Sequence, residues 1–127
     1  MKIILSSNDI IHQYIKSLLI IEKSNLEGEY KIGNKEGKQI IKLFKLLEKN
    51  YDLAKEVLQP LLEHESIKVK ICASAHCLSL KIFEKNAEEI LENILKLKIK
   101  IFSFEAEMIL KVWREQGYLK MYPEQKI

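Results

Sequence analysis

The chain has 127 residues, of which 47% are hydrophobic and 31% charged, with only four Gly and two Pro. This composition excludes a disordered or collagen-like protein, and its abundance of Leu, Ile, Lys and Glu is typical of helices. The net charge of +3 comes from 20 Lys and a single Arg mixed with 18 acidic residues. Such a mixture describes a solvated surface, and the scarcity of Arg disfavours a nucleic-acid site. The length suits one domain, so we expect a single helical-repeat domain over residues 1–127.

Nothing in the chain has the length or character of a membrane or export segment. The uncharged apolar stretches, such as residues 17–21, are far shorter than the roughly 20 residues that a membrane span needs. The first residues, 1–5, lack the apolar core and the cleavage site of a signal peptide. We therefore expect a cytoplasmic protein that does not associate with membranes.

The first two predicted helices follow from caps and apolar periodicity. A capping cluster at residues 6–9 precedes apolar residues spaced by three and four, which predicts a helix over about 9–23. A second helix is predicted over 29–49. Gly33 and Gly37 weaken its first half by about 1 kcal/mol each relative to Ala. These glycines indicate either a close approach by another helix or a frayed helix start.

The third and fourth predicted helices occupy the middle of the sequence. The third covers about 50–63 and contains Pro60, which predicts either a kink near Glu56 or a late helix start. Ser66 is the expected cap of a fourth helix over 67–82. Because this helix is the most apolar of all, we expect it to be central.

The last two predicted helices are separated by an ambiguous segment. A fifth helix is expected over 84–97, and a sixth over 104–116 with Ser103 as its N-cap. Between them, residues 95–102 alternate apolar residues and lysines, a pattern that fits a helix end, a loop or a half-buried strand. The tail, 118–127, is expected to pack at first and to fray at its end.

A weak internal repeat relates the second half of the chain to its middle. Residues of matching size and polarity recur 33 positions apart: Leu58, Leu61, Leu62, Val69, Ile71, Ala73, Cys77 and Leu80 match Leu91, Ile94, Leu95, Phe102, Phe104, Ala106, Leu110 and Trp113. Pairs of amphipathic helices repeated in this way are the signature of HEAT and armadillo arrays, whose units are about 40 residues long. The sequence therefore predicts an all-α fold: a short HEAT- or armadillo-like, right-handed array of about six antiparallel helices.

Candidate chemistry is sparse. Cys72 and His76 are four residues apart, so a helix would place the thiol and the imidazole on one face. Two such groups do not complete a zinc site or a catalytic set, and we interpret His76 as a half-buried residue that is hydrogen-bonded to a neighbouring helix. Cys77 is expected to be reduced and structural. His64 is expected to cap or solvate the turn after the third helix. We therefore predict no catalytic, cofactor-binding or metal-binding residue, and a protein that is not an enzyme.

The residues from Gly33 to Gly117 resemble a known family. The resemblance is carried by Asn34, by the run Leu58-Gln59-Pro60-Leu61-Leu62-Glu63-His64, by Val69-Lys70 and Ala73, and by Phe104-Glu105-Ala106 with Leu110, Trp113 and Gly117. In this pattern the chain is similar to the small bacterial HEAT-like domain of unknown function numbered two-thousand-nineteen. That resemblance implies a stand-alone protein linked to bacterial toxins, and hence a role as an immunity protein.

The leading hypothesis is thus a protein-binding module that binds and neutralises a toxin domain. Its expected contact surface combines exposed positions of the second, fourth and sixth helices: Lys38, Lys42, Lys45, Lys70, Ser74, Lys111 and Arg114. Such a lysine-rich side suits a partner with an acidic or mixed surface. The alternative is a nucleic-acid-binding helical array that uses Lys96, Lys98, Lys100, Lys111 and Arg114 against phosphate. The sequence leaves the oligomeric state open.

Overall fold

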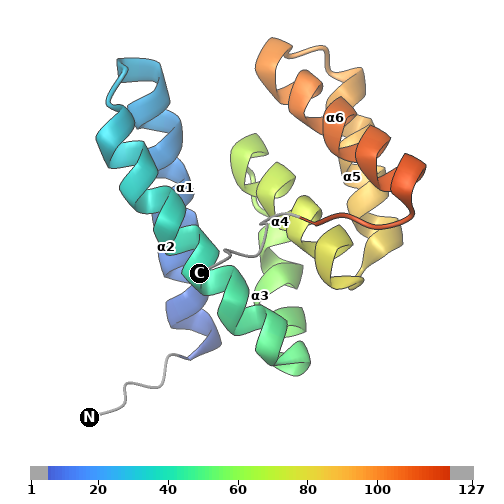
Figure 1. Ribbon diagram of the computed structural model, residues 1–127, viewed down its shortest axis with the longest axis horizontal. Coiled ribbons are helices and arrows are strands. Elements are labelled where there is room, and N and C mark those ends of the chain that lie inside the picture. The colour runs from blue at the N-terminus through green and yellow to red at the C-terminus, as the bar shows by residue number, and fades with distance from the viewer. Residues whose placement is uncertain (1–5, 121–127) are drawn as a thin grey trace, which may run out of the picture. The chain divides into compact units, whose positions relative to one another are not determined.

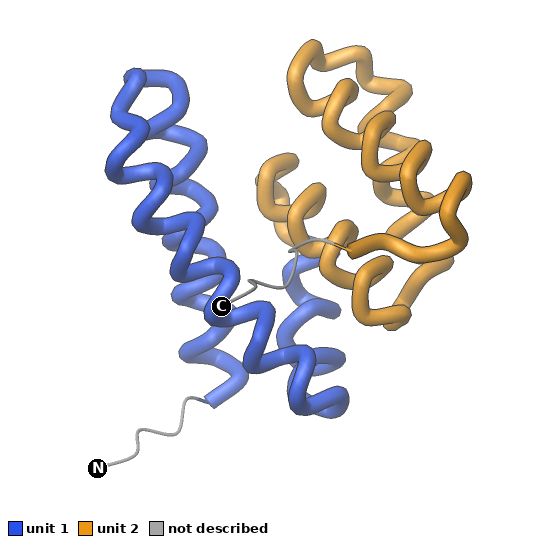
Figure 2. The backbone as a smooth tube through the Cα atoms, in the orientation of Figure 1, with its two compact units in different colours: residues 1–63 blue, residues 64–127 orange. Residues whose placement is uncertain are grey.

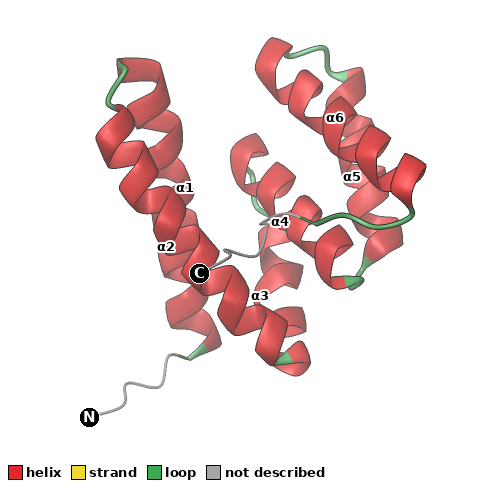
Figure 3. Cartoon of the chain, in the orientation of Figure 1, coloured by secondary structure: helices red, strands yellow, loops and turns green. Residues whose placement is uncertain are grey.

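In a computed structural model that describes residues 6–120, the chain forms six α-helices and no strand within that range (Figures 1 and 3). The helices are α1 (Ser7–Glu27), α2 (Tyr30–Lys49), α3 (Tyr51–Leu62), α4 (Ile67–Leu80), α5 (Glu84–Lys96) and α6 (Lys100–Gln116). The predicted all-α fold of six helices is confirmed. The chain divides between Glu63 and His64 into two compact units (Figure 2). The right-handed stacking and the single domain over residues 1–127 stay predictions, and the expectations for 1–5 and for the tail end, 121–127, lie outside the described residues.

Helix α1 is longer than predicted because both of its ends are capped. The Ser6 hydroxyl accepts a hydrogen bond from the Asp9 amide at 3.2 Å, and the Asp9 carboxylate accepts one from the Ser6 amide at 3.2 Å. This capping box starts the helix at Ser7. The other end extends to Gly28, which adopts a φ of 73° and whose amide bonds back to the last carbonyls.

Helix α2 packs antiparallel beside α1, and both contact α3 within the first unit (Figure 1). Their apolar faces are buried, and a polar connection crosses between them: buried Ser17 donates to Glu36 at 2.8 Å and accepts from Gln13 at 2.9 Å. Gly33 lies inside a continuous helix, and a Cβ atom there would lie 2.8 Å from the Ser24 hydroxyl oxygen. The close helix approach is therefore confirmed at Gly33, and the frayed start is wrong.

Helix α3 accommodates Pro60 near its C-terminal end. Asn50 starts the helix, because its side-chain oxygen accepts a hydrogen bond from the Leu53 amide at 3.1 Å. The predicted late start is therefore wrong. The proline lies two residues before the end of the helix at Leu62. Because it has no N–H, it removes one donor to the Glu56 carbonyl, and only a short stretch of helix follows it.

In the second unit, α4 contacts both α5 and α6, which also contact each other. Eight of its residues are buried, and they lie on nearly all sides of the helix, in agreement with the most apolar pattern of the sequence. The Ser66 hydroxyl accepts from the Val69 amide at 3.3 Å, as predicted for the cap. The helix ends at Leu80 rather than residue 82, because Lys81 takes the left-handed conformation, with a φ of 61°.

The ambiguous segment 95–102 contains a helix end, a turn and a helix start. Helix α5 ends at Lys96 and α6 begins at Lys100, so within the described residues the strand alternative is wrong. Ser103, the predicted N-cap, lies inside α6. Its hydroxyl accepts a hydrogen bond from the Ile99 amide at 2.8 Å and donates one to the Ile94 carbonyl at 3.0 Å. This one side chain connects the end of α5 to the first turn of α6.

Both members of the internal repeat are buried at four of its eight steps. Ala73 in α4 and Ala106 in α6 are both fully buried, as expected of matching close-packing points. The clear exception is the pair Ile71 and Phe104: Ile71 is buried, whereas Phe104 is 62% exposed. The sixth helix therefore places a large aromatic side chain in solvent where the repeat predicts a buried one.

Candidate partner-binding surface

The lysines expected on α2 are accessible. Lys38 and Lys42 are exposed. Lys45 is partly exposed and lies 3.7 Å from the Glu48 carboxylate, one turn further along the same helix. All three belong to the first unit, whereas the other expected contact residues belong to the second.

The expected contact residues on α4 do not lie on a solvent-exposed face. Lys70 is half-buried, and Ser74 is fully buried with a hydroxyl that has no hydrogen-bond partner among residues 6–120. The assignment of Ser74 to an exposed contact surface is therefore wrong. Ser74 follows Lys70 by four residues and therefore lies on the same side of α4. That side of the helix is buried at Ser74, like the other sides of α4.

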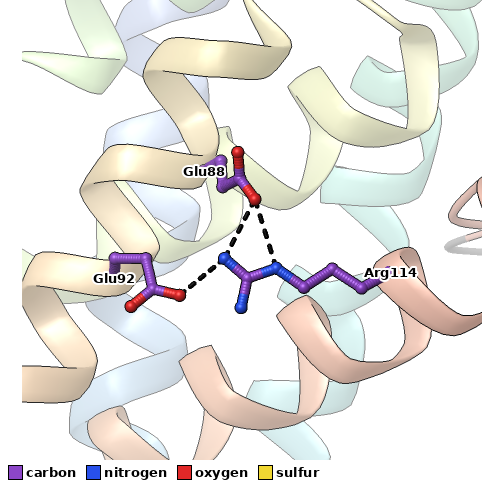
Figure 4. Close-up of polar contacts among 3 residues, drawn as sticks. All are labelled: Glu88, Glu92 and Arg114. Carbon is purple, nitrogen blue, oxygen red and sulfur yellow. Dashed lines mark hydrogen bonds and ion pairs between the residues drawn. The ribbon is translucent and has the colours of Figure 1, made fainter.

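Arg114 is exposed, but its guanidinium is already held by two carboxylates of α5 (Figure 4). Nε and Nη2 donate to Glu88 Oε2 at 3.1 and 2.9 Å, and Nη2 also donates to Glu92 Oε1 at 2.6 Å. The two hydrogen bonds with Glu88, and then the one with Glu92, raise the pKa of Arg114. Arg114 thus joins α6 to α5, and a phosphate or a partner carboxylate would have to compete with this arrangement.

The same residues line an open depression of about 430 Å³ on the second unit. Glu88, Glu89, Glu92, Asn93, Lys96 and Arg114 form its lining. Three carboxylates outnumber two cations there, so the depression offers no excess of positive charge to an anion. This distribution disfavours Arg114 as a phosphate contact.

The Cys72 and His76 pair occupies one face of α4, as predicted, with Sγ and Nε2 3.9 Å apart. His76 is fully buried, not half-buried, and burial lowers its pKa to about 3. Burial also raises the pKa of the Cys77 thiol to about 12, and neither cysteine forms a disulfide. A neutral imidazole closed to solvent is a poor general base for a substrate. Among residues 6–120, no group of three or more His, Cys, Asp or Glu is placed to hold a metal ion.

His64 has a local structural role. Its Nδ1 atom accepts a hydrogen bond from the Ser66 amide at 3.0 Å, in the turn between α3 and α4. This contact confirms the predicted capping role at that turn.

A surface that sequence reasoning missed lies along α6. Ile101, Phe104 and Met108 are 69%, 62% and 41% exposed, and their spacing of three and four aligns them on one face of the helix. We call these three residues the α6 stripe. They lie on the side opposite the buried Ala106 and Leu110. The signal was present in the sequence, because the helix carries apolar residues on two faces while only one can pack inward.

Basic residues border the N-terminal end of the α6 stripe. Lys96, Lys98 and Lys100 are all exposed and alternate with Leu97, which is 56% exposed, and Ile99, which is 40% exposed. The first turn of α6 contains no acidic residue. At the other end of the stripe, Lys111 follows Met108 by three residues and is also exposed. The alternation that suggested a strand therefore forms a basic and apolar turn that leads into the α6 stripe.

Comparisons with known proteins establish the fold and nothing further. No protein-family model and no curated protein matches the chain. The chain is similar in structure to the protein RPA1889 from Rhodopseudomonas palustris CGA009, known from a crystal structure, with a TM-score of 0.80 and 18% sequence identity over 94% of this chain and 95% of that one. No helix among residues 6–120 combines the length and the apolar character needed to cross a membrane. At this identity the likeness shows a shared fold, and the family resemblance seen in the sequence stays a prediction.

Proposed function

We propose that this chain is a non-enzymatic protein-binding module, and that it acts in the cytoplasm as an immunity protein which binds and neutralises a bacterial toxin domain. The observation that supports protein binding is the α6 stripe. Large apolar side chains that adjoin one another in solvent mark interaction sites, because water solvates them poorly. Phe104 is the natural anchor, since aromatic residues contribute strongly to interface energy.

The α6 stripe is held on a rigid support. Ala106 and Leu110 are buried on the opposite face of α6, Ser103 bonds to the end of α5, and Arg114 is bound to Glu88 and Glu92. A surface that is already ordered loses little conformational entropy when a partner binds. This preorganisation favours binding through α6 over binding through a loop.

The proposed contact surface therefore differs from the lysine set expected from the sequence. Lys111 is the member of that set that lies beside the α6 stripe. Ser74 is buried and Arg114 is engaged within the unit. Lys38, Lys42 and Lys45 remain accessible on α2, where they serve as comparison positions.

The identity of the partner as a toxin rests on the family resemblance carried by residues 33–117. Immunity proteins act by binding, without performing a reaction, and they cover an essential surface of the toxin. An exposed apolar stripe with a basic border is suited to that task, because it supplies both buried area and charge selectivity.

Co-expression with a toxin domain tests the proposal. The neighbouring open reading frames are read first. If one encodes a secreted protein, the full chain is produced together with the C-terminal domain of that protein, and growth inhibition and co-purification are measured. We expect the chain to relieve growth inhibition and to co-purify with the domain. The double variant Ile101→Ser/Phe104→Ser should lose both properties, whereas the control Lys38→Ser/Lys42→Ser should keep them.

Two results would contradict the proposal. One is unchanged toxicity and no complex in the presence of the wild-type chain. The other is binding to oligonucleotides that falls steeply between low and moderate salt, which would favour the nucleic-acid alternative.

A further inference from the structure

We infer that the α6 stripe receives an amphipathic helix of the partner whose apolar face is bordered by carboxylates, and that these carboxylates lie over Lys96, Lys98 and Lys100. The inference deepens the proposed function, since it takes protein binding as given and specifies the chemistry of the element that docks.

The shape of the surface fits a helix. Ile101 and Met108 are seven residues apart on one helical face, so the α6 stripe extends about 10 Å along two turns. A second helix with apolar residues at the same spacing of three and four can pack along such a ridge. An extended peptide would instead need a free strand edge, and the described residues form no strand.

The charge pattern specifies what borders the partner's apolar face. Lys96, Lys98 and Lys100 are exposed, and none of them forms an ion pair with any of residues 6–120. Lys96 also lines the carboxylate-rich depression, so Lys98 and Lys100 supply most of the positive charge at this border. The positive end of the α6 dipole adds to this potential, because no acidic side chain lies in the first turn. Carboxylates on the docked helix would pair with these lysines at the border of the interface, where opposite charges select partners and orientation.

A second copy of this chain complements the surface poorly. A parallel pairing of two α6 helices would place the three lysines of one copy over the same three lysines of the other copy. An antiparallel pairing would place them over the C-terminal half of α6, where Lys111 and Arg114 accompany Glu115. Neither orientation supplies a net negative surface.

An anionic membrane surface also fits less well than a protein. Glu107 is exposed and lies next to Met108 and one turn from Phe104. If the α6 stripe entered a lipid surface, this carboxylate would be pressed against negative headgroups. A protein partner can instead offer a donor to Glu107 while it offers acceptors to the lysines.

Two synthetic helical peptides of identical length test the charge pattern. Both carry the same leucine stripe, but one is bordered by Glu and the other by Lys, and binding to the full-length chain is measured by fluorescence anisotropy. We expect the Glu peptide to bind and the Lys peptide to bind at least about tenfold more weakly. The variant Lys96→Glu/Lys98→Glu/Lys100→Glu should reverse this preference.

Two control variants separate charge from fold. Lys35→Glu/Lys38→Glu/Lys42→Glu makes the same charge change at exposed positions of α2 and should leave the preference as in the wild type. Phe104→Ser should abolish binding of the Glu peptide, and circular dichroism should show that every variant retains its helices.

Three outcomes would overturn the inference. They are equal affinity for the two peptides, a homodimer by light scattering that Phe104→Ser dissociates, and binding to phosphatidylserine vesicles that the same substitution removes. Selective binding of the Glu peptide by a chain that does not bind the toxin domain would contradict the immunity role and support this inference. Toxin neutralisation with no preference between the peptides would support the immunity role and contradict this inference.

Discussion

Gly33 of α2 lies so close to Ser24 of α1 that a Cβ atom at position 33 would lie 2.8 Å from the Ser24 hydroxyl oxygen. Ser24 is buried, and its hydroxyl donates a hydrogen bond to the Ile21 carbonyl at 3.0 Å. The oxygen cannot move away without giving up that bond. Gly37 lies one turn further along α2, and a Cβ atom at position 37 would have no other atom within 4 Å.

The two glycines should therefore respond differently to alanine. Gly37→Ala should raise the free energy of unfolding by about 1 kcal/mol, because alanine favours the helix and meets free space. Gly33→Ala gains the same propensity but must displace Ser24, an overpacking cost of about 1–3 kcal/mol, so it should be neutral to destabilising. Urea denaturation of both variants measures the difference. A Gly33→Ala variant as stable as Gly37→Ala would show that the helices are not in close contact here.

A Ser24→Ala background provides the control for this contact. Without the hydroxyl oxygen, the next atom that a Cβ at position 33 would approach is 3.5 Å away, on Asn25. Gly33→Ala should then become stabilising. If the effect of Gly33→Ala is the same in both backgrounds, Ser24 does not limit the approach.

The buried hydroxyl of Ser74 should be dispensable. It has no hydrogen-bond partner among the described residues, so its burial costs free energy that no contact returns. We expect Ser74→Ala to raise the free energy of unfolding by about 1 kcal/mol. Ser79→Ala on the same helix controls for the higher helix propensity of alanine. A Ser74→Ala variant less stable than wild type would indicate a bond that the hydroxyl makes in solution.

Buried His76 should make folding sensitive to mild acid. The pKa of this imidazole is about 3 in the folded chain, against an ordinary value of 6.5, so below pH 6.5 the unfolded state binds the proton and the folded state does not. The stability contributed by the neutral imidazole is thus complete above pH 6.5 and is lost as the pH falls toward 3. Between pH 6.5 and 5 the loss should approach about 1.4 kcal/mol per pH unit.

Denaturation at several pH values measures this loss, and His76→Gln should flatten the profile. His12→Gln, at an exposed position of α1, controls for the removal of a histidine. If His76→Gln fails to fold, NMR titration of the wild-type imidazole gives the answer directly. An imidazole that takes up its proton near pH 6 in the folded chain would contradict the buried, neutral assignment.

Arg114 should act within the second unit more than on a partner. Arg114→Ala removes the hydrogen bonds to Glu88 and Glu92, and we expect a small decrease in melting temperature that added salt abolishes, because the group is exposed. Binding of the Glu-bordered peptide should remain close to that of wild type. A large loss of binding without a change in stability would return Arg114 to the contact surface.

Much of the fold could be predicted because local signals and packing agree. The capping cluster at residues 6–9 and the cap at Ser66 both mark helix starts in the structure. The start of α6 was predicted wrongly because a side chain bonds to a residue of the neighbouring helix. Ser103 resembles an N-cap in the sequence, yet its hydroxyl bonds to the Ile94 carbonyl of α5, and α6 begins before it.

The candidate site was predicted less well than the fold, for a physical reason. Periodicity shows which residues share a helix face, but it does not show whether that face meets solvent or another helix. Lys70 and Ser74 share a side of α4, and the packing of the chain buries Ser74. Phe104 occupies a repeat position that is buried at Ile71, and packing leaves it in solvent.

The sequence by itself determined the helical class, the number of helices and most of their limits, because caps, glycines and apolar spacing act over a few residues. Only the tertiary structure decided which faces are covered, that Arg114 is bound to two glutamates, and that Ile101, Phe104 and Met108 form an exposed stripe. These properties depend on residues far apart in the chain, whose proximity is established only when the helices pack together.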